Sequence, residues 1–251
     1  RLGVLAYQNF RPWRSGVATV GFDFARYTGS IPMSGGHAHG DGSQQAAMQT
    51  LSRQFIGEYS PYVSLQQQLW RDRLVLNGGL RMANSNRFGT QWIPQVGFAV
   101  HPAEGWTLKA SMTKGYRNPS FKDMYLYQMA NPDLDPERMM NYELSYRQHL
   151  LGDRLMIGAN VFYLKADEMI QTQMTNGRPL NVNTGKTENS GFELETAWNV
   201  NTHFALNGNY SFLHMSHPQL SAPEHKLYVG GSLRQGRFVV NTGWQYVAGL
   251  Y

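Results

Sequence analysis

The stretch Phe204-Ala-Leu-Asn-Gly-Asn-Tyr-Ser-Phe212 alternates apolar and polar side chains, with the large apolar residues at even-numbered positions. Because successive side chains of a strand point to opposite faces of a sheet, this pattern predicts a strand with one apolar and one polar face. Trp106–Met112 and Phe238–Tyr246 repeat it. Eleven such stretches fill the chain, or twelve if Leu2–Phe10 is counted. An antiparallel sheet with one wet face shows the same alternation, so a soluble β protein is an alternative at this point.

The connections between these stretches alternate between tight and long. Tight connections fall at 71–72, 101–105, 151–153, 199–202 and 234–236, and long ones at 28–53, 84–90, 117–138, 171–186 and 214–223. Outer-membrane barrels are built this way, with short periplasmic turns and longer outer loops. Aromatic residues at the tight end match the girdle of such a barrel, namely Trp70, Trp106, Trp198, Phe204 and Phe238. The sequence therefore predicts an all-β fold, an antiparallel transmembrane β-barrel of about eleven strands.

This topology predicts where particular residues lie. One end of the sheet should hold Asp72, Gly105, Gly152 and Gly236, and the other His39, Asn131, Gly177 and Pro218. The residues expected to face lipid are Leu108, Ala110, Leu206, Val240 and Trp244. Those expected to face the lumen are Lys109, Asn207, Asn209 and Asn241.

Composition excludes several classes of protein. The 251 residues have a mean hydropathy of −0.45 and contain no run of eighteen apolar residues, which excludes a helical membrane protein but not a barrel. The net charge is +5 and Lys and Arg are scattered, so nucleic acid is not an expected partner. Cysteine is absent, which excludes a thiolate metal site. No nucleophile-elbow, phosphate-loop or dinucleotide motif occurs, so an enzyme is not expected.

Three short boxes follow one another in the middle of the chain. They are Gly115-Tyr-Arg-Asn-Pro119, Asn131-Pro-Asp-Leu-Asp-Pro-Glu137 and Tyr142-Glu-Leu144. The stretch from Asn183-Thr-Gly185 to Gly191-Phe-Glu-Leu-Glu195 and the upstream stretch Tyr62–Leu80 continue the pattern. In this order and spacing the motifs resemble the C-terminal part of the β-barrel of TonB-dependent outer-membrane receptors.

That resemblance implies an architecture and a function. Family barrels have about 22 strands around an N-terminal plug. Residues 1–251 are therefore expected to form a single β-barrel region, the C-terminal half of a receptor barrel, with the plug domain outside this chain. The implied role is TonB-dependent uptake of a metal or metal chelate (siderophore, haem, cobalamin or metal ion) across the bacterial cell outer membrane. The implied partners are outer-membrane lipid, the TonB complex through the missing plug region, and the metal-chelate ligand, with no intrinsic cofactor.

Other functions remain alternatives on the sequence alone. The first is a passive outer-membrane pore, or a structural barrel without energy coupling. An outer-membrane enzyme such as a lipase is another. The discriminating features are the presence of plug sequence in the parent gene and activity on lipid substrates.

The segment between the first two boxes is the expected ligand-binding loop. Pro119, Pro132 and Pro136 cannot donate to a strand ladder and so mark it as a loop. The candidate ligand-contacting residues are Arg117, Asn118, Met124, Tyr125, Tyr127, Met129 and Asn131. Some haem receptors of the family place a His ligand between these boxes, whereas residues 120–130 contain none. A purely structural role, in which the boxes shape the loop, is the alternative.

A metal site is expected in a different long loop. In Gly35-Gly-His-Ala-His-Gly-Asp-Gly42, an extended backbone places His37, His39 and Asp41 on one side. Imidazole and carboxylate are suitable ligands for zinc, copper, nickel or iron. His214 and His217 fall in another loop at the same expected end and could complete the site. A flexible Gly-rich loop with incidental histidines is the alternative.

Overall fold

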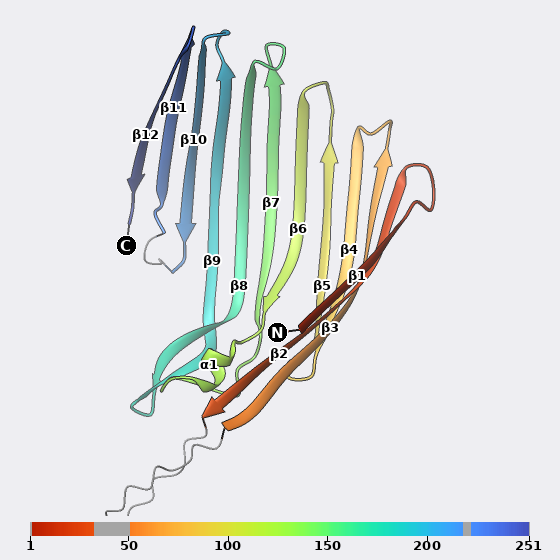
Figure 1. The fold of residues 1–251 in the computed structure, drawn as a ribbon, viewed down its shortest axis with the longest axis vertical. Coiled ribbons are helices and arrows are strands. Elements are labelled where there is room, and N and C mark those ends of the chain that lie inside the picture. Colours follow the sequence, from red (N-terminus) through yellow and green to blue (C-terminus); the bar gives the residue numbers. More distant parts are fainter. Residues whose placement is uncertain (1, 33–50, 218–221, 251) are drawn as a thin grey trace, which may run out of the picture.

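The computed structural model describes residues 2–32, 51–217 and 222–250. Over these residues the chain forms a single antiparallel sheet in which every strand pairs with its sequence neighbours, from β1 to β12 (Figure 1). The strands are β1 Leu2–Phe10, β2 Gly16–Pro32, β3 Leu51–Leu69, β4 Leu74–Ser85, β5 Gly89–Val100, β6 Trp106–Arg117, β7 Glu137–Leu150, β8 Leu155–Thr175, β9 Arg178–Asn199, β10 Phe204–Met215, β11 His225–Gln235 and β12 Phe238–Ala248. A short helix, α1 Phe121–Tyr125, lies between β6 and β7. The all-β, antiparallel fold was predicted correctly, and Leu2–Phe10 is a twelfth strand.

The two ends of the sheet differ as predicted. The meander places Asp72, Gly105, Gly152 and Gly236 in the connections of one end, and Asn131 and Gly177 in those of the other. His39 and Pro218 lie outside the described residues. We call these the short-turn end and the loop end; α1 lies at the loop end (Figure 1).

Left-handed backbone makes the short turns tight. In the β3–β4 turn Trp70, Arg71 and Asp72 have φ values of 52°, 55° and 68°. In the β5–β6 turn Gly105 has a φ of 74°, and a Cβ atom there would lie 2.9 Å from the His149 carbonyl oxygen. Glycine is therefore required at position 105 by both conformation and space.

The lengths of two connections were predicted incorrectly. Residues 171–186 are not a long loop, because β8 and β9 continue as a paired hairpin to a turn at Asn176–Gly177. Residues 84–90 also contain mainly strand, with only 86–88 between β4 and β5. The outer part of the β8–β9 hairpin lacks an apolar face, so its sequence gives no alternation to reveal the strands.

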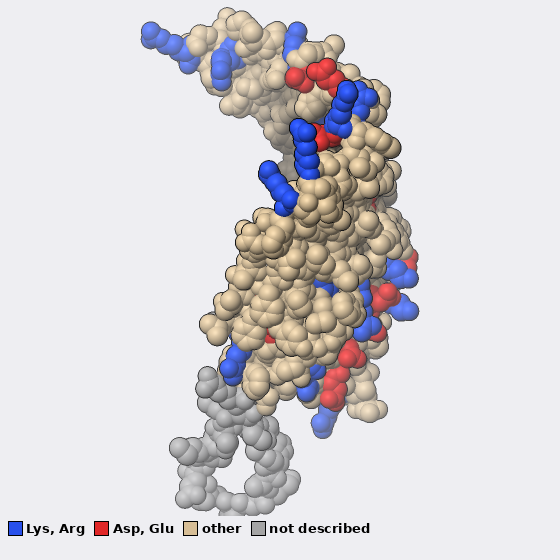
Figure 2. All heavy atoms as spheres, turned by 90° about the vertical axis from the view of Figure 1, so that its right-hand side faces the viewer, with Lys and Arg blue, Asp and Glu red and all other residues tan. Residues whose placement is uncertain are grey.

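The two faces of the sheet follow the predicted parity. Leu206, Val240 and Trp244 line one apolar groove on the outer face. Leu108 and Ala110 share that face through their pairing with Tyr146 and Leu144. The polar face carries Lys109 and Asn209, which line a common cavity, and by register Asn207 and Asn241. On the side shown in Figure 2, charged side chains gather toward the two ends and leave an uncharged band between them.

Buried side chains concentrate at the loop end instead of forming a central core. Ile56, Met124 and Leu134 make up a buried apolar cluster, against which Phe121 and Ile170 pack. The described residues contain no helix long and apolar enough to cross a membrane. The best-packed part of the chain is therefore the place where the β6–β7 loop meets the sheet.

Candidate ligand-capture loop and lumen wall

The β6–β7 loop, residues 118–136, has a defined structure that begins with a capped helix. The Ser120 side chain accepts a hydrogen bond from the Asp123 amide, and the Asp123 carboxylate accepts one from the Ser120 amide at 2.9 Å. This reciprocal capping box satisfies two amides at the start of α1. Five residues would be too short for a stable isolated helix, so tertiary contacts must hold it.

Apolar packing anchors the loop to the sheet. Met124 is 1% exposed and lies with Leu134 of the same loop against Ile56 of β3. Burying a side chain such as methionine contributes about 1.5–3 kcal/mol. The loop is thus attached to strands that lie far from it in the sequence.

Two asparagines of β9 hold the loop by its backbone. The Asn181 side chain donates to the Asp123 carbonyl at 3.1 Å, and its amide donates to the Met129 carbonyl at 2.7 Å. The Asn131 side chain donates a hydrogen bond to the Asn181 carbonyl at 2.8 Å. The Asn183 side chain accepts from the Asp135 amide and donates to the Asp135 carbonyl, both at 2.8 Å. These bonds fix the path of the loop at several points.

An ion pair between an exposed arginine and a buried glutamate closes the base of the loop. Arg117, the last residue of β6, donates two hydrogen bonds to Glu137, the first residue of β7, one of them at 2.6 Å. Glu137 is 6% exposed and also accepts from the Ile170 amide at 2.9 Å. Burial alone would raise the pKa of Glu137, but the hydrogen bonds from Arg117 and Ile170 outweigh it and leave that pKa below its usual value. The hydrogen bond to Glu137 likewise raises the pKa of Arg117.

The predicted ligand-contacting residues divide into two groups in the structure. Met124 is in the buried cluster, Asn131 is bonded to β9, and Asn118 donates to Glu58 at 2.9 Å. Tyr125 packs partly buried against the same cluster, and the Met129 carbonyl accepts from β9. The exposed side chains are those of Tyr127, at 70%, and Arg117. A role in contacting a ligand stays a prediction for all seven residues, although the residues of the first group have clear structural partners.

The histidine candidates are not brought together among the described residues. His37, His39 and Asp41 lie outside them. His214 is exposed near the end of β10, and the His217 ring lies 3.2 Å from the Ser216 hydroxyl. No group of three or more His, Cys, Asp or Glu residues suited to a metal occurs in the described part of the chain. The metal site therefore stays a prediction.

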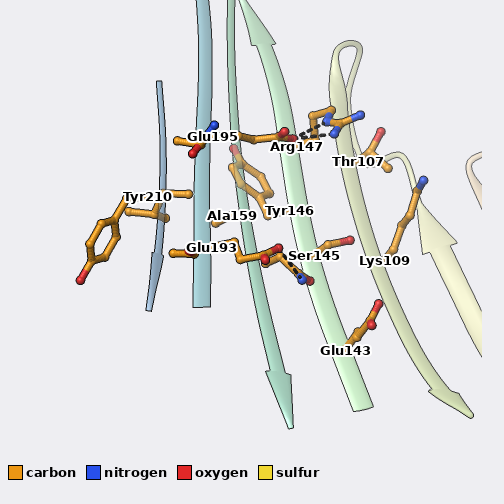
Figure 3. A pocket seen from close by; sticks show the side chains of 14 residues that line it. Thr107, Lys109, Glu143, Ser145, Tyr146, Arg147, Ala159, Glu193, Glu195 and Tyr210 are labelled. Atoms are coloured by element: carbon orange, nitrogen blue, oxygen red, sulfur yellow. Dashed lines mark hydrogen bonds and ion pairs between the residues drawn. The ribbon is translucent and has the colours of Figure 1, made fainter. Parts of the chain in front are cut away.

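A second feature is a cavity of about 580 Å³ on the concave, polar face of β6–β10 (Figure 3). Arg147 donates to Glu195 at 2.5 Å across this wall. Lys109 and Glu143 lie in the same cavity, and Figure 3 shows the Tyr210 side chain pointing away from it. These strands carry charged side chains on this face and apolar side chains on the opposite face. This difference indicates that the charged face borders a water-filled lumen.

Sequence reasoning missed several residues that organise the site. Asn181 and Asn183 fall in the connection 171–186 that was predicted to be a long loop, and neither Glu58 nor Ser60 was singled out. The alternate spacing of the two asparagines was a usable signal, because residues two apart in a strand share a face. Nothing in the sequence identifies their partners in the 118–136 loop.

Comparisons with known proteins agree with this architecture. The model of the TonB dependent receptor-like β-barrel family matches residues 3–251. The vitamin B12 transporter BtuB of Photobacterium profundum is 27% identical over 123 residues, which make up 47% of this chain and 20% of that protein.

Solved structures share the fold over nearly the whole chain. The siderophore receptor PirA from Pseudomonas aeruginosa gives a TM-score of 0.76 at 17% identity, covering 99% of this chain and 46% of that one. The copper transporter OprC gives a TM-score of 0.76 at 16% identity, covering 98% and 42%. This chain thus spans less than half the length of these relatives. It belongs to the TonB dependent receptor-like β-barrel family of the outer membrane.

Proposed function

We propose that this chain supplies barrel wall and a ligand-capture loop to a receptor for TonB-dependent uptake of a metal or metal chelate. The observation that carries the proposal is the 118–136 loop, which is held in place by Glu137, Asn181 and Asn183 instead of lying free. A loop fixed before the ligand arrives loses less conformational entropy on binding, so more of the contact energy appears as affinity. Relatives include a siderophore receptor, a vitamin B12 transporter and a copper transporter, which favours this cargo class.

The partners follow from the same proposal. The apolar belt of the outer face of β6–β12 contacts outer-membrane lipid, and the polar face surrounds the plug region of the complete receptor. That plug region connects the receptor to the TonB complex. The proposed cargo is a siderophore, haem, cobalamin or a metal ion, and the receptor needs no intrinsic cofactor to bind it.

The test is uptake by cells that express the full-length receptor, with and without an intact TonB system. Iron-loaded siderophores, haem, cobalamin and copper are supplied separately in labelled form. We expect one of these cargoes to accumulate only when both the receptor and TonB are present. Entry that depends on the receptor but not on TonB would instead establish a passive pore.

His37 and His39 are predicted to contribute to capture of a metal or metal complex. In the full-length receptor, His37→Ala/His39→Ala should weaken binding of the transported metal or chelate. Neutral imidazole is the ligand form, so wild-type binding should weaken as the pH falls below about 6.5. Titration with iron, zinc and copper ions and with haem measures both effects. Unchanged affinity for all four would leave capture to the 118–136 loop.

A further inference from the structure

A second cavity, of about 390 Å³, lies between the capture loop and strands β2 and β3. Its walls combine the rings of Tyr27, Tyr116 and Phe121 with the apolar side chains of Ile56 and Pro119. This volume is within the range of small-ligand pockets, which are mostly apolar with a few polar groups. The charged group here is a single carboxylate, that of Glu58.

Glu58 is fixed in the cavity by neutral donors. Asn118 donates to one carboxylate oxygen at 2.9 Å, and Ser60 donates to the other at 3.3 Å. The Tyr116 ring lines the same cavity beside this carboxylate. These bonds hold the carboxylate in one orientation but leave its negative charge without a counter-ion.

Three cationic side chains of the neighbouring strands have partners of their own. Arg81 forms an ion pair with Asp23, and Arg117 forms one with Glu137. Arg26 lies 4.8 Å above the Phe55 ring. Among the described residues, no ion pair reaches Glu58. The cavity thus presents one fixed anion inside an aromatic and apolar wall.

This combination selects a particular ligand chemistry. Aromatic faces attract cations through their quadrupole, and the attraction is strongest where water is excluded. A carboxylate beside those rings adds direct charge attraction, whereas an anionic group would be repelled. Each oxygen of Glu58 already accepts a hydrogen bond, from Asn118 or from Ser60, so the ligand needs a positive charge more than it needs N–H groups.

We propose that this cavity binds an alkylammonium group carried by the ligand that the capture loop takes up. The inference rests on the proposed capture function, because it places the cavity directly behind that loop. It specifies the chemistry of one part of the cargo, namely an alkylammonium group. It also separates the roles of the two cavities, since the wall of β6–β10 contains cations of its own.

The test uses tetramethylammonium as the probe and 2,2-dimethylpropanol as its neutral counterpart of similar shape. Binding to the full-length receptor in a nonionic detergent is measured by isothermal titration calorimetry. We expect the cation to bind at least tenfold more tightly than the alcohol. Glu58→Gln, which keeps the size and shape of the side chain but removes the charge, should reduce cation binding at least tenfold.

Two further variants make the result specific. Tyr27→Leu removes one ring and should weaken cation binding about threefold to tenfold. Glu104→Gln removes a carboxylate at the short-turn end, where it is exposed, and should leave binding unchanged. Retention of the heat-modifiable band in gel electrophoresis shows that each variant still forms a barrel.

Several outcomes would overturn the inference. Equal affinity for the cation and the alcohol would remove the charge selectivity, as would equal losses in Glu58→Gln and Glu104→Gln. The measurement does not depend on transport. A receptor that binds the cation but fails to import any metal chelate would therefore refute the proposed function and not this site.

Discussion

Replacing Glu137 with alanine is expected to release the 118–136 loop from the sheet. The change removes the nearer ion-pair partner of Arg117, leaves it only Asp123 at 3.8 Å, and leaves the Ile170 amide without its acceptor. Hydrogen bonds to charged groups contribute about 1.5–3 kcal/mol each, and unpaired buried groups add a penalty. We expect a loss of about 3 kcal/mol in the free energy of loop opening, which speeds local amide exchange about 100-fold. Hydrogen exchange followed by mass spectrometry on the intact receptor measures this effect.

Glu168→Ala is the matched control for this experiment. Glu168 forms an ion pair with Arg138 at 3.4 Å at the same end of the sheet, but both side chains are exposed. Such exposed pairs contribute about 0–1 kcal/mol, so exchange in the loop should change little. Equal acceleration by Glu168→Ala and Glu137→Ala would contradict the view that the buried Glu137 carboxylate closes the loop.

The same carboxylate predicts the effect of pH on the loop. The pKa of Glu137 is lower in the folded receptor than in an unfolded chain. Its stabilising contribution is therefore fully present above the ordinary glutamate pKa of about 4.3 and is lost as the pH falls through the lower folded value. Loop exchange in the wild type should accelerate over that acid range. Glu137→Gln should lack this acid-dependent step.

The fold was predictable because the membrane imposes a local pattern. Each residue of a spanning strand such as β10 faces either lipid or the lumen, so its polarity reports its side of the sheet. The outer hairpin of β8 and β9 has no lipid on either side, and its alternation disappears. That is why residues 171–186 were taken for a loop although the backbone pairs continue to Thr175 and Arg178.

The site was less predictable because its contacts join distant segments. From the sequence, Met124 could equally well contact a ligand or pack in an apolar core. Only its packing on Ile56 distinguishes the two roles. Asn131 and Asn181 are hydrogen-bonded although they are 50 residues apart. Motifs indicated a loop between β6 and β7, but they gave no information about the strand that holds it.

The position of the lipid belt decides where a charge is most damaging. Leu206 is among the residues expected to face lipid, but β10 begins at Phe204, so Leu206 is close to the short-turn end and not at mid-span. On β7, Leu144 lies midway between Tyr146, which makes an edge contact with Trp106, and Tyr142, which packs on Tyr163. Lys114 and Lys165 lie on the same face, two residues along their strands from the register position of Tyr142 and Tyr163. This register places Leu144 near the middle of the apolar belt.

Leu144→Arg is therefore expected to destabilise the barrel by about 2–4 kcal/mol, whereas a charge close to the interface, as in Leu206→Arg, should cost about 0–1 kcal/mol. Leu144 is 48% exposed on the outer face, where an arginine would enter hydrocarbon. Its neighbour Ser145 lines the lumen cavity with Glu143, so Ser145→Arg is the matched control and should cost much less. Guanidinium titration of the intact receptor in lipid vesicles, followed by tryptophan fluorescence, compares the three variants. Equal destabilisation at positions 144 and 145 would mean that the two faces of β7 meet the same environment, which a lipid-facing outer surface forbids.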